Sequence, residues 1–236
     1  MPETSDPTGQ VPLGYYPQPL EGAEAALLFV QGQYLLHTRE GNVDRVKFLA
    51  PASVRQAFTL ERIDSGWLPE GVCRWGTGPA GDWMLAYHQP QVYEIQVEMK
   101  ENRPPRRLKV PLPALAFFGC DDNYYLWALR GVSLEPKAQL YRAPLPNINE
   151  HGLICFGSNQ RPRVSAASFA EAWRLFLAAP FNDHHADGLS REFPEDVRRQ
   201  LAKLYRERAK RYPARDLVRI DNTLEGAVDR LTNRHR

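Results

Sequence analysis

The chain has 236 residues, of which 43% are hydrophobic and 25% are charged, with 30 Lys and Arg against 28 Asp and Glu. This ordinary globular composition excludes a wholly disordered chain, a collagen and a coiled-coil rod, and a net charge of +2 disfavours a surface that attracts polyanions everywhere. The longest apolar run, residues 25–30, is too short to span a bilayer, so no membrane segment is expected.

The cysteine content bears on the compartment in which the protein works. Cys73, Cys120 and Cys155 are an odd number without a Cys-x-x-Cys pair, which disfavours both a disulfide framework and a cysteine zinc site. Free thiols are typical of a reducing compartment, and residues 1–22 lack the apolar core of a signal peptide. We therefore expect a soluble cytoplasmic protein.

The N-terminal part predicts a lead-in and then an extension over residues 23–80. Residues 1–22 carry five prolines and are expected to be extended or mobile. Two apolar runs separated by Gln31-Gly32 predict a β-hairpin, and residues 43–50 predict a third strand. Pro51 suits the first position of a helix that continues to Ile63, and the Gly- and Pro-rich residues 66–81 predict a loop.

Residues 81–236 predict an α+β domain, which we expect to form one globular unit with the extension (residues 23–236). Runs of β-branched and aromatic residues at short spacing predict an antiparallel meander, with strands over residues 82–89, 91–99, 106–112, 115–120 and 124–131. Pro111 and Pro113 cannot donate to a sheet, so their strand is an edge or ends there. Residues 140–164 have no periodicity, and an ordered loop of this length is often functional.

Helices are predicted after this loop. Ser168 and Glu171 fit a capping box at the start of a helix with an apolar stripe of Phe169, Trp173, Phe176 and Leu177. Pro194 suits the start of a second helix that ends before Pro213, and residues 224–231 predict a shorter third one. Strands followed by a long loop and then by helices indicate the α+β class.

The most distinctive pattern lies in the long loop, where Pro146-Asn147-Ile148 is followed by Gly152, Ile154 and Cys155. This segment resembles the active-site segment of ubiquitin-conjugating enzymes. In those enzymes Pro-Asn-Ile/Val is followed by three variable residues, a Gly, one further residue, Ile/Val and then the catalytic Cys. The Cys lies eight residues after the Asn. The resemblance implies a ubiquitin-conjugating-like fold, in which a β-meander is followed by an active-site loop and C-terminal helices. It does not extend to the first 80 residues.

Three stretches, residues 120–129, 141–147 and 154–159, resemble the protein B family of the PRTRC cassettes, which are named for their ParB-related and ThiF-related members. That family is a divergent ubiquitin-conjugating-like group from bacteria. The resemblance implies two partners, namely a ThiF-type adenylating enzyme and a small ubiquitin-like protein. It does not imply the acceptor of a transfer.

Cys155 is the predicted carrier of an acyl group as a thioester. A thiolate is both a nucleophile and a leaving group, and Cys155 lies in a polar loop. The amide of Asn147 is a donor of the kind that stabilises a tetrahedral oxyanion, and Gly152 permits a left-handed turn that folds the Asn arm back towards the Cys. Exchange of thioesters requires no cofactor, and no metal is expected. The alternative is that Cys155 is a small buried hydrophobe and Asn147 a turn former.

Two features depart from the ubiquitin-conjugating pattern. Leu145 replaces the His that precedes Pro-Asn in the family and that is thought to buttress the loop. The acidic residue that orients and deprotonates an attacking lysine in the family corresponds by position to residues 181–188. Asp183 is the first candidate for this role, with Asp187 and His184 as alternates. The segment also reads as a solvated connector.

Other functions stay open on the sequence. One is a catalytically silent ubiquitin-conjugating-like scaffold, and another is a DNA-associated accessory protein. The basic residues of 194–212 suggest DNA, although acids at the start of a helix and bases at its end are ordinary. A thiol hydrolase would pair Cys155 with His184. A metal site would use Asp183, His184, His185 and Asp187, but adjacent His side chains on an extended backbone point apart.

Overall fold

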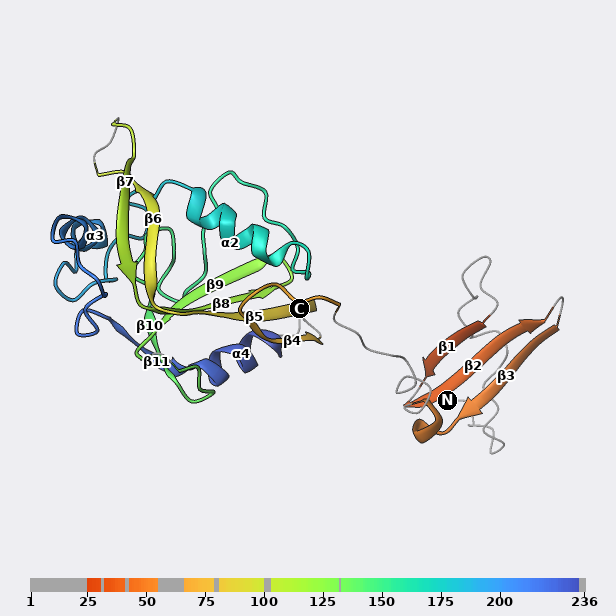
Figure 1. The fold of residues 1–236 in the computed structure, drawn as a ribbon. Helices are drawn as coiled ribbons and strands as arrows, with labels where there is room; N and C mark the ends of the chain where they lie inside the picture. Colours follow the sequence, from red (N-terminus) through yellow and green to blue (C-terminus); the bar gives the residue numbers. More distant parts are fainter. Residues whose placement is uncertain are drawn as a thin grey trace, which may run out of the picture. The chain divides into compact units, whose positions relative to one another are not determined.

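The computed structural model describes residues 25–30, 32–40, 43–54, 66–78, 81–99, 103–131 and 133–233. The chain divides into two compact units, Met1–Asp64 and Ser65–Arg236, which are described separately below (Figure 1). The boundary expected at residue 80 lies inside the second unit, because the strand before it pairs there. The expected lead-in over residues 1–22 lies outside the described residues.

The first unit contains a three-stranded antiparallel sheet. Its strands are β1 (Ala25–Val30), β2 (Gln33–Glu40) and β3 (Val43–Leu49), in the order β1-β2-β3. The predicted hairpin and third strand are therefore confirmed, with Val30 opposite Gln33 across the first turn. Residues 51–54 are helical, whereas residues 55–63 of the predicted helix lie outside the described residues.

The second unit is built on a six-stranded antiparallel sheet in the order β11-β10-β9-β8-β5-β4. Its strands are β4 (Val72–Gly78), β5 (Gly81–His88), β8 (Ala114–Cys120), β9 (Asn123–Leu129), β10 (Gln139–Arg142) and β11 (Arg219–Thr223). A separate antiparallel pair comprises β6 (Gln91–Val97) and β7 (Arg106–Leu112), and the helices are α2 (Phe169–Ala178), α3 (Val197–Arg206) and α4 (Leu224–Thr232). The α+β class with antiparallel sheets is confirmed.

The strands are not joined as the simple meander that the sequence predicts. Strand β5 pairs with β8, while β6 and β7 form a hairpin that leaves the sheet, as Figure 1 shows. Pro90 follows β5 and Pro113 precedes β8, so the chain lacks a backbone donor at each point where it leaves or rejoins the sheet. Pro111 is tolerated in β7 because a two-stranded sheet consists of edges only.

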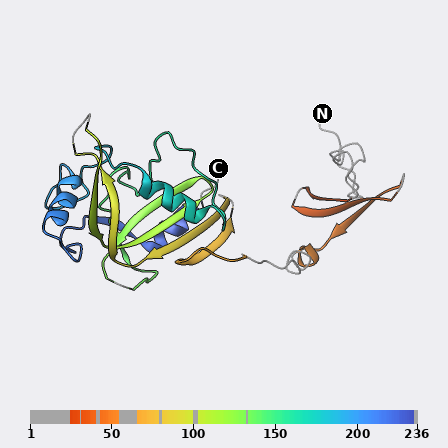
Figure 2. The ribbon, with the colours of Figure 1, turned by 45° about the horizontal axis from the view of Figure 1, so that its top comes forward.

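The middle strands β8 and β9 are buried on both faces, because a helix covers each face. Phe117 lies in a cluster with Phe169 and Phe176 of α2, and Phe118 lies in a second cluster with Val228 of α4. Figures 1 and 2 show α2 and α4 on opposite sides of the sheet. Successive residues of a strand point to opposite faces, so the neighbouring pair Phe117-Phe118 serves both clusters.

The prediction of a loop over residues 66–81 is wrong in part, because β4 occupies residues 72–78 and forms an edge of the sheet. Gly76 lies directly opposite Trp83 of β5, and a Cβ atom at Gly76 would lie 2.6 Å from the Trp83 indole. Gly76, one of the glycines that suggest a loop, therefore makes room for an aromatic ring in a strand. Strand β10 likewise falls at the start of the predicted long loop, where it pairs with β9 and β11.

The helices lie near their predicted positions, but the cap of α2 and the start of α3 differ. The side chain of Ser168 makes no cap to α2, because its Oγ donates to the Arg163 carbonyl; the predicted capping box is wrong. Helix α3 begins at Val197 and not at Pro194, because Asp196 is its cap and accepts from the Arg198 N–H at 2.9 Å. Helix α4 follows a Thr223 cap.

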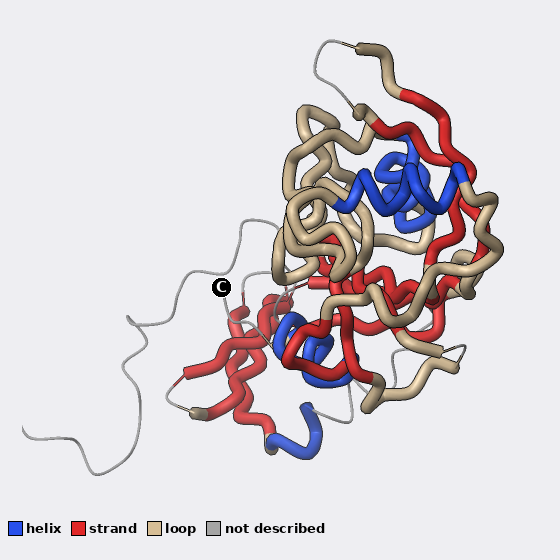
Figure 3. The backbone as a smooth tube through the Cα atoms, turned by 90° about the vertical axis from the view of Figure 1, so that its left-hand side faces the viewer, coloured by secondary structure: helices blue, strands red, loops and turns tan. Residues whose placement is uncertain are grey.

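Long stretches of irregular backbone connect these elements in the second unit, as the tan segments in Figure 3 show. Two of them, residues 143–168 and 179–196, lie on either side of α2 in the chain and hold the predicted site residues. None of the helices in the described residues is long and apolar enough to cross a membrane.

Candidate active site

The segment of residues 146–156 folds back on itself against β9. The Leu126 N–H donates to the Gly152 carbonyl and the Ile154 N–H donates to the Tyr124 carbonyl, both at 2.8 Å. These bonds extend the sheet locally, so the segment is fixed by backbone contacts to a buried strand. An irregular loop thereby acquires the rigidity that a reactive side chain requires.

The tip of this segment is organised by Asn149. Its side-chain oxygen accepts from the N–H groups of His151 at 2.9 Å and Leu153 at 3.0 Å, closing an Asx turn. On the two arms of the turn, Ile148 and Ile154 form an antiparallel bridge and are both at most 2% exposed. The arm that carries Asn147 is thus returned to the arm that carries the cysteine.

Gly152 has the left-handed backbone that the sequence predicts, with φ +91°. A second constraint comes from Trp127 of β9, because a Cβ atom at Gly152 would collide with its Nε1 and lie 2.8 Å from its Cδ1. The same indole N–H donates to the His151 carbonyl at 3.1 Å. Gly152 is therefore required both for the turn and for the close approach of the tryptophan.

Cys155 lies on the surface between two buried neighbours. Ile154 is 2% exposed and Phe156 is 6% exposed, whereas the side chain of Cys155 is exposed to solvent. The alternation of a strand therefore turns the thiol outward while the residues beside it anchor the backbone. The Sγ atom makes no hydrogen bond to any described residue. Cys155 is thus not the buried small hydrophobe of the alternative interpretation.

Asn147 joins three segments that are distant in the sequence. Its carbonyl accepts from the Cys155 N–H and its N–H donates to the His184 carbonyl, both at 2.8 Å, while its side-chain amide donates to the Pro180 carbonyl at 3.2 Å. The residue has φ +63° and is 8% exposed. Asn tolerates this left-handed conformation better than most residues. One N–H of its amide is occupied by Pro180.

The connector of residues 181–188 is held at both ends. Phe181 is fully buried; its N–H donates to the Gln96 carbonyl of β6 at 2.8 Å, and its carbonyl accepts from the N–H of Glu98, just after β6, at 2.9 Å. At the other end, Arg142 Nη1 donates to the Gly188 carbonyl at 3.2 Å. The connector is consequently an ordered wall beside the cysteine segment.

Asp183, the predicted acidic residue, is exposed on this connector. The pKa of Arg198 is raised, first by its hydrogen bonds with Asp196 and also by the nearby charge of Asp183. No hydrogen bond in the described chain joins Asp183 to Cys155, so the link between the two runs through Asn147.

The two histidines of the connector lie close together. The rings of His184 and His185 are 4.0 Å apart between centroids, and the expectation that they point apart is wrong because His185 has φ +52°. Among the described residues no group of three or more His, Cys, Asp or Glu is placed to hold a metal ion. Neither imidazole hydrogen-bonds Cys155 in that part of the chain, as a thiol hydrolase would require.

Leu145 occupies the position of the missing histidine and is fully buried in the main core cluster. Its N–H donates to the Ala143 carbonyl at 2.8 Å. The segment before Asn147 is therefore held by apolar packing where a polar buttress is expected.

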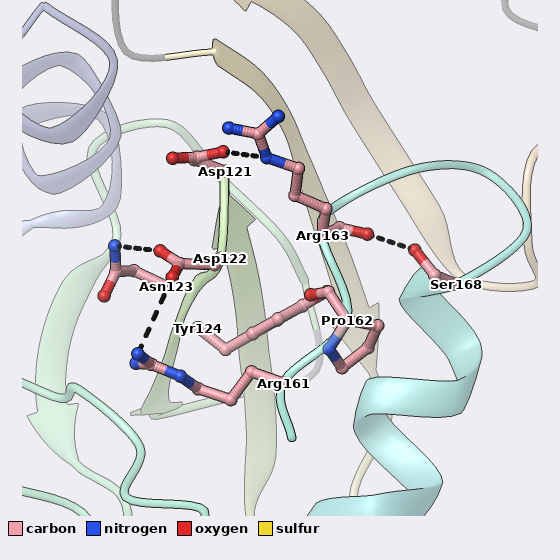
Figure 4. A network of polar contacts seen from close by, with 8 residues as sticks. All are labelled: Asp121, Asp122, Asn123, Tyr124, Arg161, Pro162, Arg163 and Ser168. Atoms are coloured by element: carbon pink, nitrogen blue, oxygen red, sulfur yellow. Dashed lines mark hydrogen bonds and ion pairs between the residues drawn. The ribbon is translucent and has the colours of Figure 1, made fainter.

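The segment after Cys155 is fastened to the turn between β8 and β9 (Figure 4). The Tyr124 hydroxyl donates to the Pro162 carbonyl at 3.0 Å, and Arg163 Nε donates to Asp121 Oδ1 at 2.7 Å. Burial raises the pKa of Tyr124 to about 12, so its hydroxyl stays a donor at neutral pH. In Figure 4 Arg161 also points to Asp122, with the two charged groups 3.6 Å apart. Cys155 is thus held from both sides.

Comparison with known protein families identifies the group to which the chain belongs. The model of prokaryotic E2 family D matches residues 46–220, which is well over half of the chain and includes the whole cysteine segment. The protein is a member of prokaryotic E2 family D. The match begins at residue 46 and so includes residues 46–80, to which the resemblance seen in the sequence does not extend. Searches of curated proteins and of solved structures gave no significant match.

Membership of prokaryotic E2 family D makes the chain ubiquitin-conjugating-like, and such proteins interact with ubiquitin-like proteins and with activating enzymes. Two residues that shape the site of this family member are not found by sequence reasoning. From its residue type Asn149 indicates only a turn. Arg142 lies in the short strand β10, which the sequence does not predict. Besides Gly188, Arg142 faces Glu150 at 4.0 Å across a recess between the cysteine segment and the connector.

Proposed function

We propose that the protein is a thioester carrier that accepts a small ubiquitin-like protein on Cys155 and transfers it to an amine. The observation that supports this most directly is the exposed thiol of Cys155, turned outward between the buried Ile154 and Phe156 in a member of prokaryotic E2 family D. A carrier must present its thiol to two large partners in turn, and a thiol in a cleft would serve this purpose poorly.

In the first step the Cys155 thiolate attacks the carbonyl carbon of the thioester that links the ubiquitin-like protein to its activating enzyme. A tetrahedral oxyanion forms, and it collapses with expulsion of the activating enzyme's thiolate. In the second step a neutral amine attacks the new thioester, loses a proton and expels the Cys155 thiolate, which leaves an amide. No cofactor takes part in either step, since one thioester replaces another and the amide is more stable than both.

Asn147 and Asp183 have distinct roles in this proposal. The amide of Asn147 supplies a hydrogen bond to the oxyanion, which is the charge that develops in both steps. Asp183 orients the attacking amine from the connector that Asn147 ties to the cysteine segment. The resemblance to the protein B family of PRTRC cassettes points to a ThiF-type adenylating enzyme as the donor.

A charging assay tests the proposal. The protein is mixed with ATP, a ThiF-type adenylating enzyme and a small ubiquitin-like protein from a PRTRC cassette, and then separated without reductant. We expect an upshifted band that a thiol reagent abolishes and that Cys155→Ala lacks. Cys73→Ala is the matched control, because the Cys73 thiol donates to the Leu85 carbonyl at 3.2 Å and burial raises its pKa. It should charge like the wild-type protein.

Two results would contradict the carrier function. The first is a band of equal intensity in Cys155→Ala, which would place the acyl group elsewhere. The second is the absence of a band although the adenylating enzyme charges itself. If the uncharged protein still binds the ubiquitin-like protein, it is a scaffold of the ubiquitin-conjugating type.

A further inference from the structure

A cationic pocket lies in the second unit, away from the cysteine segment. It has a volume of about 480 Å³ and is formed by the turns after β5, β7 and β9 together with the residues that follow α3. This volume falls within the range of roughly 300–1,000 Å³ typical of ligand sites. The cysteine segment bonds to Tyr124 and Leu126 of β9, whereas the pocket lies beyond Leu129. At about 3.3 Å per residue, Tyr124 and Leu129 are roughly 17 Å apart.

The floor of the pocket is apolar and its rim is basic. Leu112, Leu129 and Leu217 form part of the floor, and each is at most 2% exposed. Arg130, Lys210 and Arg211 line the rim, and no Asp or Glu is among the lining residues. None of the three cations forms an ion pair with another described residue. The recess therefore combines uncompensated positive charge with a hydrophobic base.

One wall of the pocket is fixed by a buried polar network. Asp216 is 4% exposed, and its carboxylate accepts from the hydroxyls of Tyr212 and Ser190 and from the Glu192 N–H. All these donors are engaged by the one carboxylate, whose negative charge is thereby satisfied inside the wall. Burial and the neighbouring Asp216 raise the pKa of Tyr212, so its hydroxyl remains a donor at every physiological pH.

The rim is partly preorganised as well. Arg130 Nη2 donates to the Ala214 carbonyl at 3.0 Å, and its guanidinium carbon lies 5.5 Å from the centre of the Tyr141 ring. A guanidinium has five N–H donors in a planar fork, so donors remain for a carboxylate. A side chain that is already oriented loses less entropy on binding than a free one.

Two basic residues of α3 are engaged by acids and so interrupt a cationic stripe for nucleic acid. In α3, Arg198 pairs with Asp196 at 2.9 Å and Lys203 pairs with Glu192. The unpaired rim cations surround a hollow with an apolar floor, and a phosphate backbone has no group that would bury there. A peptide has both kinds of group.

We propose that this pocket binds an acidic peptide segment of a partner protein, which inserts a large apolar side chain between Arg130, Lys210 and Arg211. The carboxylates of the segment meet the rim, and the apolar side chain covers the leucines of the floor. Ile154, beside the thiol, bonds to Tyr124 near the start of β9, whereas the pocket lies at the end of that strand, so such a partner leaves the thiol accessible.

Fluorescence anisotropy of the full chain with labelled peptides tests the proposal. The probe is a short peptide that places Leu-Phe between flanking Asp and Glu residues. One control peptide replaces the acids by Asn and Gln, and another replaces Leu-Phe by Ser-Ser. We expect saturable binding of the probe and a Kd at least about tenfold weaker for each control, since a charge-assisted contact or a buried apolar side chain contributes about that factor.

Matched protein variants locate the site. The double variant Lys210→Gln/Arg211→Gln should weaken binding of the probe about tenfold or more. Arg206→Gln/Arg208→Gln removes the same charge from exposed residues outside the pocket and should change the Kd less than threefold. Unchanged melting temperatures show that both variants fold.

Three outcomes overturn the proposal: no binding of the probe by the folded protein, equal weakening by the two double variants, or equal affinity for the Ser-Ser peptide. A duplex DNA that binds more tightly than the probe and is weakened alike by both double variants would also overturn it, in favour of a nucleic-acid surface.

Discussion

Replacement of Gly152 by Ala tests whether the cysteine segment is locked to β9. Ala at φ +91° costs about 1–2 kcal/mol of conformational strain. Its Cβ would also collide with Trp127, which adds about 1–3 kcal/mol for overpacking, and displacement of the indole leaves a buried N–H without its His151 acceptor, for about 1 kcal/mol more. We expect Gly152→Ala to lower the free energy of unfolding by about 4 kcal/mol.

Gly157→Ala is the matched control for this prediction. Gly157 has φ +61°, but a Cβ atom there would meet no atom within 4 Å, so only the conformational cost of about 1 kcal/mol applies. Urea unfolding followed by tryptophan fluorescence suits the comparison, since all five tryptophans lie in the second unit. Equal losses in the two variants would refute the close approach of Trp127 to Gly152.

Two further predictions concern buried polar groups. Tyr212→Phe leaves the buried Asp216 carboxylate short of one donor and should lower the free energy of unfolding by about 1–3 kcal/mol. In the same urea assay the control Tyr205→Phe, which removes an exposed hydroxyl, should change it by no more than about 0.5 kcal/mol. Similar losses in the two variants would contradict the Asp216 network. Burial lowers the pKa of His88 from 6.5 to about 4, so as the pH falls the imidazole is protonated in the unfolded chain before it is protonated in the folded one. The free energy of unfolding should therefore fall by about 2–3 kcal/mol as the pH drops from 6.5 to 4. His88→Phe, which keeps a ring stacked on Trp173, should flatten this slope relative to the wild-type protein, and parallel curves would argue against a buried neutral His88.

The positions of most strands follow from the sequence, but their pairing does not. Residues 82–88 and 115–120 show the composition of strands, and both become strands. That they pair with each other depends on the departure of the β6–β7 hairpin from the sheet, which is decided by packing against α2 and α3. Prolines mark the points of departure, yet a proline alone does not tell whether a strand ends or turns away. Local composition therefore predicts elements better than it predicts neighbours.

The geometry of the cysteine segment is predictable to a similar extent. The left-handed turn at Gly152 follows from the residue type and from the spacing of the motif. The contacts of Asn147 with Pro180 and His184 do not, because they join segments more than thirty residues apart. The sequence does not predict edge strand β4, because Gly76 is typical of a loop. Its place in a strand is explained only by Trp83, which lies opposite it on β5.

The anchoring of Asn147 constrains how the proposed carrier works. One amide N–H donates to the Pro180 carbonyl, so an oxyanion beside Cys155 is served either by the second N–H or by a rotation that gives up Pro180. Rotation would leave a carbonyl without its donor at the end of α2, at a cost of about 1 kcal/mol. Use of the second N–H carries no such cost and keeps the connector, with Asp183, in place while the oxyanion forms. On this argument Asn147→Asp, which retains the shape of the side chain but has no side-chain N–H, should slow both charging and transfer. If Asn147 has only a structural role, the folded variant should charge and transfer at the wild-type rate.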